Sequence, residues 1–196
     1  MIETPWGYDV DAAAVPPLIE LADFHEMTGG QFSQDSRLQT SIDAVTARMR
    51  SWCGWHVWPR LECEATLDGG DRCVWLPASS VSDVLSVTVR GVPLAEGSWQ
   101  WGSDGRLRLP RTPDELRCVT VRYVAGVAGD SCPADLAELV AHRVVHNVAL
   151  PFGVASESSG GVSISYSATA VANAGGPNLT VRDRDTLAAY KLWEAR

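Results

Sequence analysis

The chain has 196 residues, of which 45% are hydrophobic and 20% are charged, a composition typical of one large globular domain or of a domain that carries an insertion. Its net charge of −8 argues against a partner that is held through phosphates, because such binding depends on clustered Lys and Arg. No apolar run reaches the roughly 18 to 20 residues that cross a bilayer. The N-terminal segment MIETPWGYDVD has acids where a signal peptide has Lys or Arg, so we expect neither export nor a membrane partner.

Five cysteines are spread along the chain without a CxxC motif. An odd number of thiols at wide spacing fits neither a disulfide framework nor a zinc knuckle. We therefore expect small buried hydrophobic residues in a reducing cytosol, and no cofactor. The cysteines are Cys53, Cys63, Cys73, Cys118 and Cys132.

Two helices are predicted near the N-terminus. The first runs from about Pro17 to Met27, because proline suits a first turn and the following Thr-Gly-Gly stops a helix. The second begins at Asp35 or Ser36, whose side chains can accept from free N–H groups, and ends at Gly54. Apolar residues recur along it in steps of four and three, which predicts one buried stripe: Leu38, Ile42, Val45, Met49 and Trp52. The charged residues off this stripe are expected at the surface or against another subunit: Arg37, Asp43, Arg48 and Arg50.

The following block changes to the alternating pattern of half-buried strands. We expect about six short antiparallel strands between residues 60 and 125. Turn residues separate them, and Asp104-Gly105 strongly favours a tight hairpin. The buried faces are predicted to be Leu85, Val87 and Val89 in one strand and Val119, Val121 and Tyr123 in another.

Helical character returns after the strands. The third helix is apolar on most sides after Glu138, which predicts a central or interface position. A final helix starts with Thr180 and Asp183 at capping-box spacing. Its inward face is predicted to be Leu187, Tyr190 and Trp193. The fold class is α+β, and the predicted ranges are 1–59 for the N-terminal helices, 60–125 for an inserted β subdomain, 131–151 for the central helix, 152–180 for a long loop and 181–196 for the C-terminal helix.

Glu138, His142 and His146 stand four residues apart on the third helix and form the candidate metal site. Two histidines four residues apart can share a zinc ion, but the HExxH order of such sites is absent here. Four-residue steps also drift by about 40° on an ideal helix, so the three residues converge poorly on one ion. The alternative to a metal site is a polar stripe that faces solvent or another subunit, and we favour this interpretation. No nucleophile elbow or phosphate-binding glycine motif is present, so we expect no enzymatic activity.

Eight tryptophans are an unusually large number for this length. Trp99 and Trp101 alternate on one face of a predicted strand near a hairpin tip. Stacking on sugars or bases is one use of such a pair. Without interleaved basic residues, packing in the core or at a protein interface is the interpretation that we prefer.

The order of segments resembles a known family. A short helix ends in TGG, a longer one reads IDAVTARMRSWCGWHVWP, the β block carries RGVPL and YVAG, a helix begins CPADL, and GVASESSGGVSISYS and LAAYKL follow. This run, over about residues 18–193, resembles the head-tail connector, or head-to-tail adaptor, proteins of long-tailed double-stranded DNA phages, especially those of actinobacterial hosts.

The resemblance implies a small helical bundle of about four helices with an inserted β subdomain, in a structural protein of the virion. Copies would form a ring, typically a dodecamer, below the portal protein. The ring would extend the channel for genomic double-stranded DNA toward the stopper and tail, without sequence-specific binding. The resemblance implies no catalytic residues, and it implies assembly in the host cytoplasm. The net charge of −8 per copy would help DNA to pass without sticking. A metal-dependent enzyme and a monomeric protein-binding module stay open as alternatives.

The long loop is the predicted assembly segment. Residues 162–167 alternate apolar and serine side chains after Gly160-Gly161, which predicts a strand that can extend a neighbour's sheet. We expect this segment to be poorly ordered in the free monomer and ordered at a ring or portal contact, with a permanently disordered spacer as the alternative. The predicted partner-binding residues are Glu157, Val162, Ser163, Ile164, Ser165, Tyr166, Tyr190 and Trp193.

Overall fold

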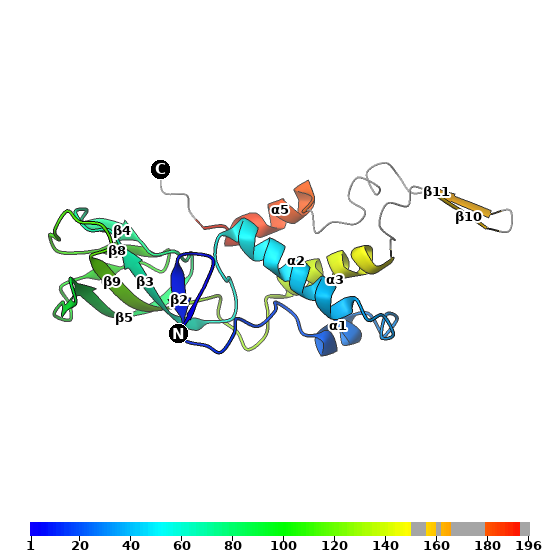
Figure 1. The fold of residues 1–196 in the computed structure, drawn as a ribbon, viewed down its shortest axis with the longest axis horizontal. Helices are drawn as coiled ribbons and strands as arrows, with labels where there is room; N and C mark the ends of the chain where they lie inside the picture. Colours follow the sequence, from blue (N-terminus) through cyan, green and yellow to red (C-terminus); the bar gives the residue numbers. More distant parts are fainter. Residues whose placement is uncertain (150–155, 160–161, 166–178, 193–196) are drawn as a thin grey trace. The chain divides into compact units, whose positions relative to one another are not determined.

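The protein is an α+β structure with antiparallel sheets, as the sequence predicts. A computed structural model describes residues 1–149, 156–159, 162–165 and 179–192 (Figure 1). The chain divides into two compact units. The first unit, here called the β unit, comprises Met1–Pro16, Arg50–Cys132 and the described residues from Ala188 onward. The second, here called the helical unit, comprises Pro17–Met49 and the described part of Pro133–Leu187.

A six-stranded antiparallel sheet forms the centre of the β unit, in the order β1-β2-β3-β9-β5-β6. Its central strand β9 pairs along its whole length with β3 and β5. Val119, Val121 and Tyr123 of β9 are all fully buried, which confirms the predicted alternation. The bounds are β1 Ile2–Glu3, β2 Tyr8–Val10, β3 Leu61–Leu67, β5 Val81–Val89, β6 Val92–Pro93 and β9 Val119–Ala125.

Of the three residues on the face predicted for β5, Val87 is buried, Val89 is half-buried and Leu85 is exposed. Leu85 is 43% exposed, whereas Val84 and Val87 are buried. The register with β9 shifts between Val81 and Asp83 and again between Val84 and Ser86. Each such bulge inserts a residue, so the side chains that follow change face and simple alternation fails.

A smaller antiparallel sheet completes the β unit, in the order β4-β8-β7. Its strands are Cys73–Trp75, Arg106–Arg108 and Gln100–Trp101. The hairpin between β7 and β8 contains Asp104-Gly105, as predicted, and Gly105 has a φ of +88° that favours glycine. Seven strands therefore lie in the block where about six were expected, and β1 and β2 add two N-terminal strands that sequence patterning missed.

The described residues form four α-helices: α1 Leu21–Met27, α2 Leu38–Cys53, α3 Ala134–Ala149 and α5 Val181–Leu187, the last followed by the 3₁₀-helix η1 Ala188–Tyr190. None of them is long and apolar enough to span a membrane. Helix α1 begins later than predicted, because Glu20 is extended and forms its N-cap. The Leu18 and Ile19 side chains are buried in the segment that precedes the helix. Its first turn is fixed by the Glu20 backbone N–H, which donates to the Asp23 carboxylate at 3.2 Å.

The buried stripe of α2 is confirmed over its first four members, Leu38, Ile42, Val45 and Met49. At the C-terminal end the buried position is Cys53, while Trp52 is half-buried with the Lys191 ammonium 5.5 Å from its ring centroid. Gly54 ends the helix with a φ of +83°, the left-handed conformation predicted for it.

Candidate functional site

The three members of the candidate metal site on α3, Glu138, His142 and His146, do not share one hollow. Glu138 and His142 are exposed and line a hollow of about 250 Å³ between α3 and α5, in which Arg143 and Arg182 also lie. His146 does not line this hollow. Burial and the Arg143 charge lower the pKa of His146. The hollow is lined by three carboxylates, those of Asp135, Glu138 and Asp183, as well as by the two guanidinium groups. No three His, Cys, Asp or Glu side chains in the described residues are arranged to hold a metal ion.

A buried ion pair joins α3 to the start of α5 inside the helical unit. Arg143 pairs with the Asp183 carboxylate, and the two side chains are only 10% and 5% exposed. The same guanidinium donates to the Thr180 hydroxyl at 2.8 Å. Thr180 and Asp183 also form the predicted capping box, with the Thr180 N–H 2.6 Å from the carboxylate. This cluster fixes the start of α5 against α3.

The predicted assembly segment contains a β-hairpin. Strand β10, Ser156–Ser159, pairs antiparallel with β11, Val162–Ser165, and the register sets Ser159 opposite Val162. The strand predicted at 162–167 is therefore present over 162–165, and its partner strand contains Glu157. Neither strand pairs with a third one in the described residues. Two of the predicted partner-binding residues, Tyr166 and Trp193, lie outside the described residues.

Tyr190 and Leu187 occupy the end of the described chain. Leu187 is fully buried, as predicted for the inward face. The Tyr190 carbonyl accepts a hydrogen bond of 2.7 Å from the Trp55 indole N–H, and the Leu192 N–H donates to the Cys53 carbonyl at 2.8 Å. Residues 188–192 are thus tied by their backbone to the end of α2, within the β unit.

Arg50 is a buried cation that sequence patterning assigned to the surface, and this prediction is wrong. Its side chain is 4% exposed and donates to the carbonyl oxygens of Pro16, His56 and Trp58 at 2.7 to 2.8 Å. These oxygens come from loops on both sides of α2, which nothing in the local sequence brings together. Burial lowers the Arg50 pKa to about 10, so the group still carries its charge at neutral pH.

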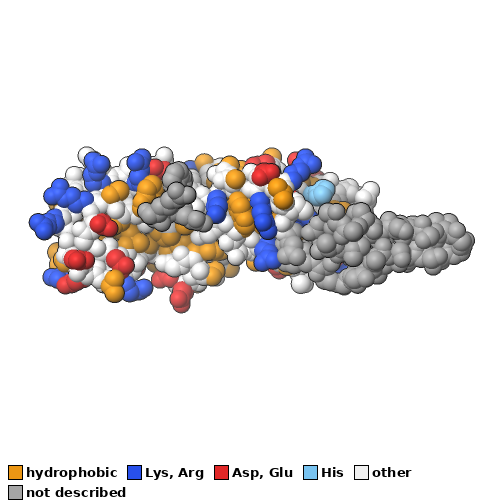
Figure 2. Space-filling model, turned by 90° about the horizontal axis from the view of Figure 1, so that it is seen from above, with side chains coloured by type: hydrophobic (Ala, Val, Ile, Leu, Met, Phe, Trp, Pro, Cys, Tyr) orange, Lys and Arg blue, Asp and Glu red, His pale blue; other side chains and the backbone are white. Residues whose placement is uncertain are grey.

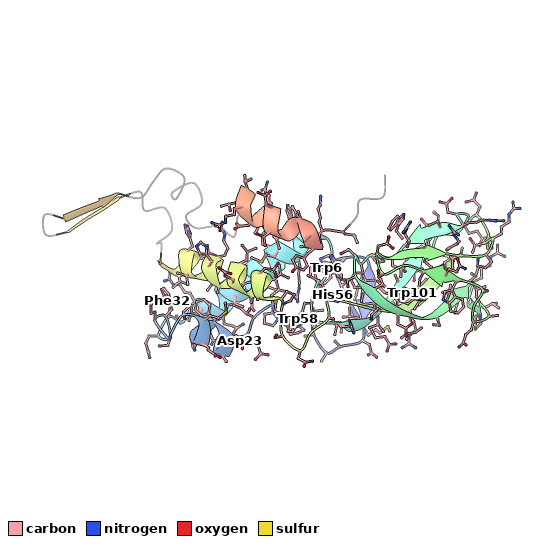
Figure 3. All side chains as sticks on the ribbon, turned by 180° about the vertical axis from the view of Figure 1, so that it is seen from behind. Trp6, Asp23, Phe32, His56, Trp58 and Trp101 are labelled. Atoms are coloured by element: carbon pink, nitrogen blue, oxygen red, sulfur yellow. The ribbon has the colours of Figure 1, made fainter. Side chains whose placement is uncertain are left out.

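His56, labelled in Figure 3, accepts from Arg50 through its carbonyl and belongs to a second buried network. Its Nδ1 lies 2.7 Å from the Tyr8 hydroxyl, its Nε2 lies 3.2 Å from the Ala125 carbonyl, and its backbone N–H donates to the same hydroxyl at 3.0 Å. These partners fit the neutral ring with its proton on Nε2. Burial lowers the His56 pKa to about 4. The network ties β2 to β9 across the loop after α2, which is a structural arrangement with no exposed reactive group.

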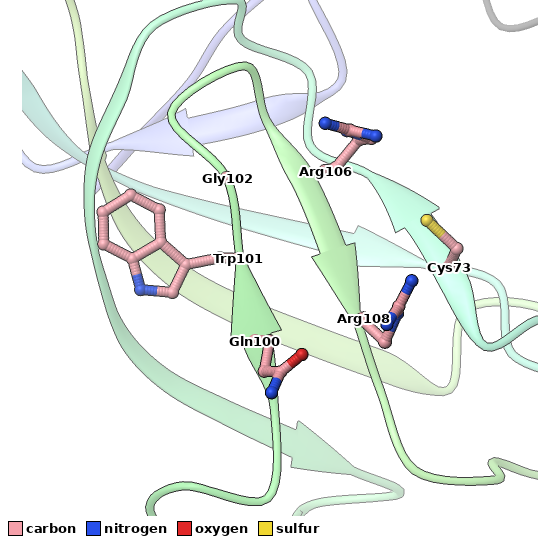
Figure 4. A pocket seen from close by; sticks show the side chains of 6 residues that line it. All are labelled: Cys73, Gln100, Trp101, Gly102, Arg106 and Arg108. Atoms are coloured by element: carbon pink, nitrogen blue, oxygen red, sulfur yellow. The ribbon is translucent and has the colours of Figure 1, made fainter.

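The outer face of the three-stranded sheet carries a hollow of about 280 Å³ lined by two arginines (Figure 4). The register aligns Cys73, Arg108 and Gln100 across the three strands, and all three are exposed. Trp101 also lines the hollow, although its ring points to the other side of β7 in Figure 4, and it is 38% exposed. Arg106 pairs with Asp104 at 2.8 Å and lies 5.8 Å from the ring centroid of Trp75. We call this surface the arginine face.

The charges around the arginine face are mixed. Figure 2 shows basic side chains gathered over the β unit, with acidic ones among them. Arg108 differs from Arg106 because it forms no salt bridge within the described residues. Trp99, the other member of the predicted tryptophan pair, is half-buried and precedes β7.

Comparison with known proteins gives a likeness of fold. No protein-family model and no curated protein sequence match the chain. Among solved structures, a chain from the neck of a native gene transfer agent (GTA) particle, computed with C12 symmetry, matches with a TM-score of 0.59 and 18% identity. The match covers 96% of this chain and 97% of that chain.

Two further matches have the same identity and the same coverage. One is a chain from the neck of an empty GTA particle, computed with C6 symmetry, with a TM-score of 0.61. The other belongs to the virion of a native GTA particle, with a TM-score of 0.58. All three matches extend over nearly the whole length of both chains, so the likeness includes both units and not one common motif.

Proposed function

We propose that the protein is a head-to-tail adaptor, a structural protein of the neck of a phage-like virion. Copies form a ring, a dodecamer by analogy, below the portal protein, extend the channel for genomic double-stranded DNA and dock the stopper or tail. The helices pack as the small bundle of this family, and assembly takes place in the host cytoplasm. The proposal keeps the host group open, although the segments quoted above resemble proteins of actinobacterial phages.

The observation that carries the proposal is the fold likeness to chains from particle necks. It extends over 96% of this chain and 97% of the neck chain, and the particles were computed with C12 and C6 symmetry. The order of sequence segments points to the same class of protein independently of the fold. Two lines of argument, one from sequence and one from structure, therefore support one function.

The β10–β11 hairpin is the proposed contact with the portal or a neighbouring copy. An isolated two-stranded hairpin is only marginally stable in water, so this one gains most from a strand added by another chain. The proposed contact residues comprise the hairpin and the C-terminal positions: Glu157, Val162, Ser163, Ile164, Ser165, Tyr166, Tyr190 and Trp193.

The test is to mix the purified chain with portal-bearing capsids that lack a neck and to image the portal vertex by cryo-electron microscopy. We expect ring-shaped density below the portal that is absent without the chain. A ring in isolation is not required, since an adaptor can stay monomeric until it meets the portal. Lack of binding to the vertex under assembly conditions would contradict the proposal.

A further inference from the structure

We propose that the arginine face of one copy binds the acidic surface of helix α1 of the next copy. This inference rests on the proposed ring and deepens it, because it names the two surfaces that meet. It concerns a contact between copies, and it makes no use of the hairpin or of the portal.

The first argument is the chemistry of the hollow on the arginine face. Arg106 and Arg108 line the hollow together with the Gln100 amide, and no carboxylate lines it. The Arg106 guanidinium is already paired with Asp104, so Arg108 is the main donor for an occupant. Arg108 has no salt-bridge partner in the described residues. Guanidinium forks bind carboxylates with two parallel hydrogen bonds, so the occupant of this hollow is expected to present acidic side chains.

The second argument is the distribution of acids along the chain. Residues 1–36 contain no Lys or Arg. Within this stretch, α1 and the residue before it expose Glu20, Asp23 and Glu26, and none of the three forms a salt bridge in the described residues. Asp23 is used in the cap of α1, whereas Glu26 lies at the other end of the helix, outside that cap. Figure 3 labels Asp23 on this helix.

The third argument is symmetry. A ring is a closed head-to-tail assembly, so each copy must present two different and complementary surfaces. The arginine face belongs to the β unit and the acidic surface of α1 belongs to the helical unit, so one chain carries both halves of the contact. Like charges on two α1 helices repel, which disfavours a symmetric contact through α1 alone. A partner with the chemistry that the arginine face requires is therefore available on every copy.

Cys73 provides a native reporter for this contact. It lies in the hollow beside Arg108, and it is the exposed member of the five cysteines, since Cys53 and Cys63 are buried and the other two are half-buried. We expect a maleimide to modify Cys73 readily in the free chain, and we expect this reactivity to be lost in assembled rings. Mass spectrometry of the modified peptides separates Cys73 from the other thiols.

Charge reversal identifies the partner surface. We expect Arg108→Glu to weaken association between copies by at least about thirtyfold, as when one member of a desolvated charge pair is left without its partner. Adding Glu26→Arg to the same chain should restore much of the association, because the two charges are then exchanged. Arg60→Glu, at an exposed position of the β unit outside the hollow, is the matched control and should assemble like the wild type.

The outcomes separate this inference from the proposed function. If the wild-type chain forms no ring at the portal vertex, the proposed function itself fails. If rings form and Cys73 stays reactive, or Arg108→Glu assembles like the wild type, only the contact proposed here is overturned. Failure of Glu26→Arg to rescue Arg108→Glu overturns the assignment to α1. If a double-stranded DNA fragment protects Cys73 without ring formation, the arginine face binds nucleic acid, and the contact with α1 is overturned.

Discussion

At the scale of single residues, His56 makes the stability of the β unit depend on pH. Its pKa in the folded protein is about 4 because the ring is buried, whereas an ordinary histidine titrates near 6.5. Between these values the unfolded chain binds the proton and the folded chain does not, so stability falls as pH falls. We expect the free energy of unfolding to drop by about 2 kcal/mol between pH 7 and pH 5 from this group.

Urea unfolding at the two pH values measures this difference. In His56→Gln the drop in the free energy of unfolding between pH 7 and pH 5 should be smaller by about 2 kcal/mol, whatever the absolute stability of the variant. His142→Gln, at an exposed position of α3, is the control and should keep the wild-type dependence. An unchanged pH dependence in His56→Gln would assign the acid sensitivity to other groups.

Arg50 is the second prediction at this scale. In Arg50→Ala, three carbonyl oxygens lose their donor in a buried site. Each such loss costs roughly 1 kcal/mol or more, so we expect a destabilisation of about 3 kcal/mol. Arg48→Ala, exposed on the same helix, should cost less than about 1 kcal/mol. Chemical denaturation compares the two variants, and equal effects would show that the buried hydrogen bonds contribute little.

At the scale of elements, the Arg143–Asp183 pair holds α5 in place. Helix α5 has seven residues, which is too short to be stable in water by itself. Asp183→Asn leaves the Arg143 charge without its counter-ion at a site that is 10% exposed, and we expect a cost of about 3 to 5 kcal/mol. Hydrogen exchange should report loss of protection in Val181–Leu187.

Two variants test the cause of that loss. Asp185→Asn removes an exposed carboxylate from the same helix and should leave the exchange of α5 unchanged. The double change Arg143→Met and Asp183→Leu replaces the pair by apolar groups and should recover much of the stability. If Asp183→Asn and Asp185→Asn behave alike, the buried ion pair is not what retains α5.

At the scale of the whole molecule, the backbone donors of the hairpin test the proposed docking. Proline at Ser158 and Ser163, which face each other in the β10–β11 register, removes one backbone donor from each strand. We expect the double variant to keep the wild-type melting temperature and to lose binding to the portal vertex. Alanine at the same two positions keeps both donors and should bind. Vertex occupancy in cryo-electron micrographs measures the outcome, and full occupancy of the proline variant would exclude backbone pairing by the hairpin as the basis of docking.

The sequence by itself determined the features that a short window encodes. The apolar period of α2 and the alternation of β9 follow from the spacing of their own residues. The alternation of β9 was predicted correctly, and so was the stripe of α2 up to Met49, but not at Trp52. The same holds for the Asp104-Gly105 hairpin and for the capping box of Thr180 and Asp183, because each is a contact between residues a few positions apart. The order of these elements was sufficient to suggest the class of protein.

Only the tertiary structure decided which side chains meet across long separations. Arg50 was assigned to the surface because its helix position is polar, yet its three carbonyl partners come from loops on both sides of α2. Leu85 is exposed and not buried as predicted, because bulges arise where β5 pairs with β9. Strand β2 exists because residues 8–10 pair with residues 63–65 of β3, which three residues of local sequence cannot encode. Burial and pairing depend on partners distant in the chain, and for that reason local periodicity found the elements but not all of their contacts.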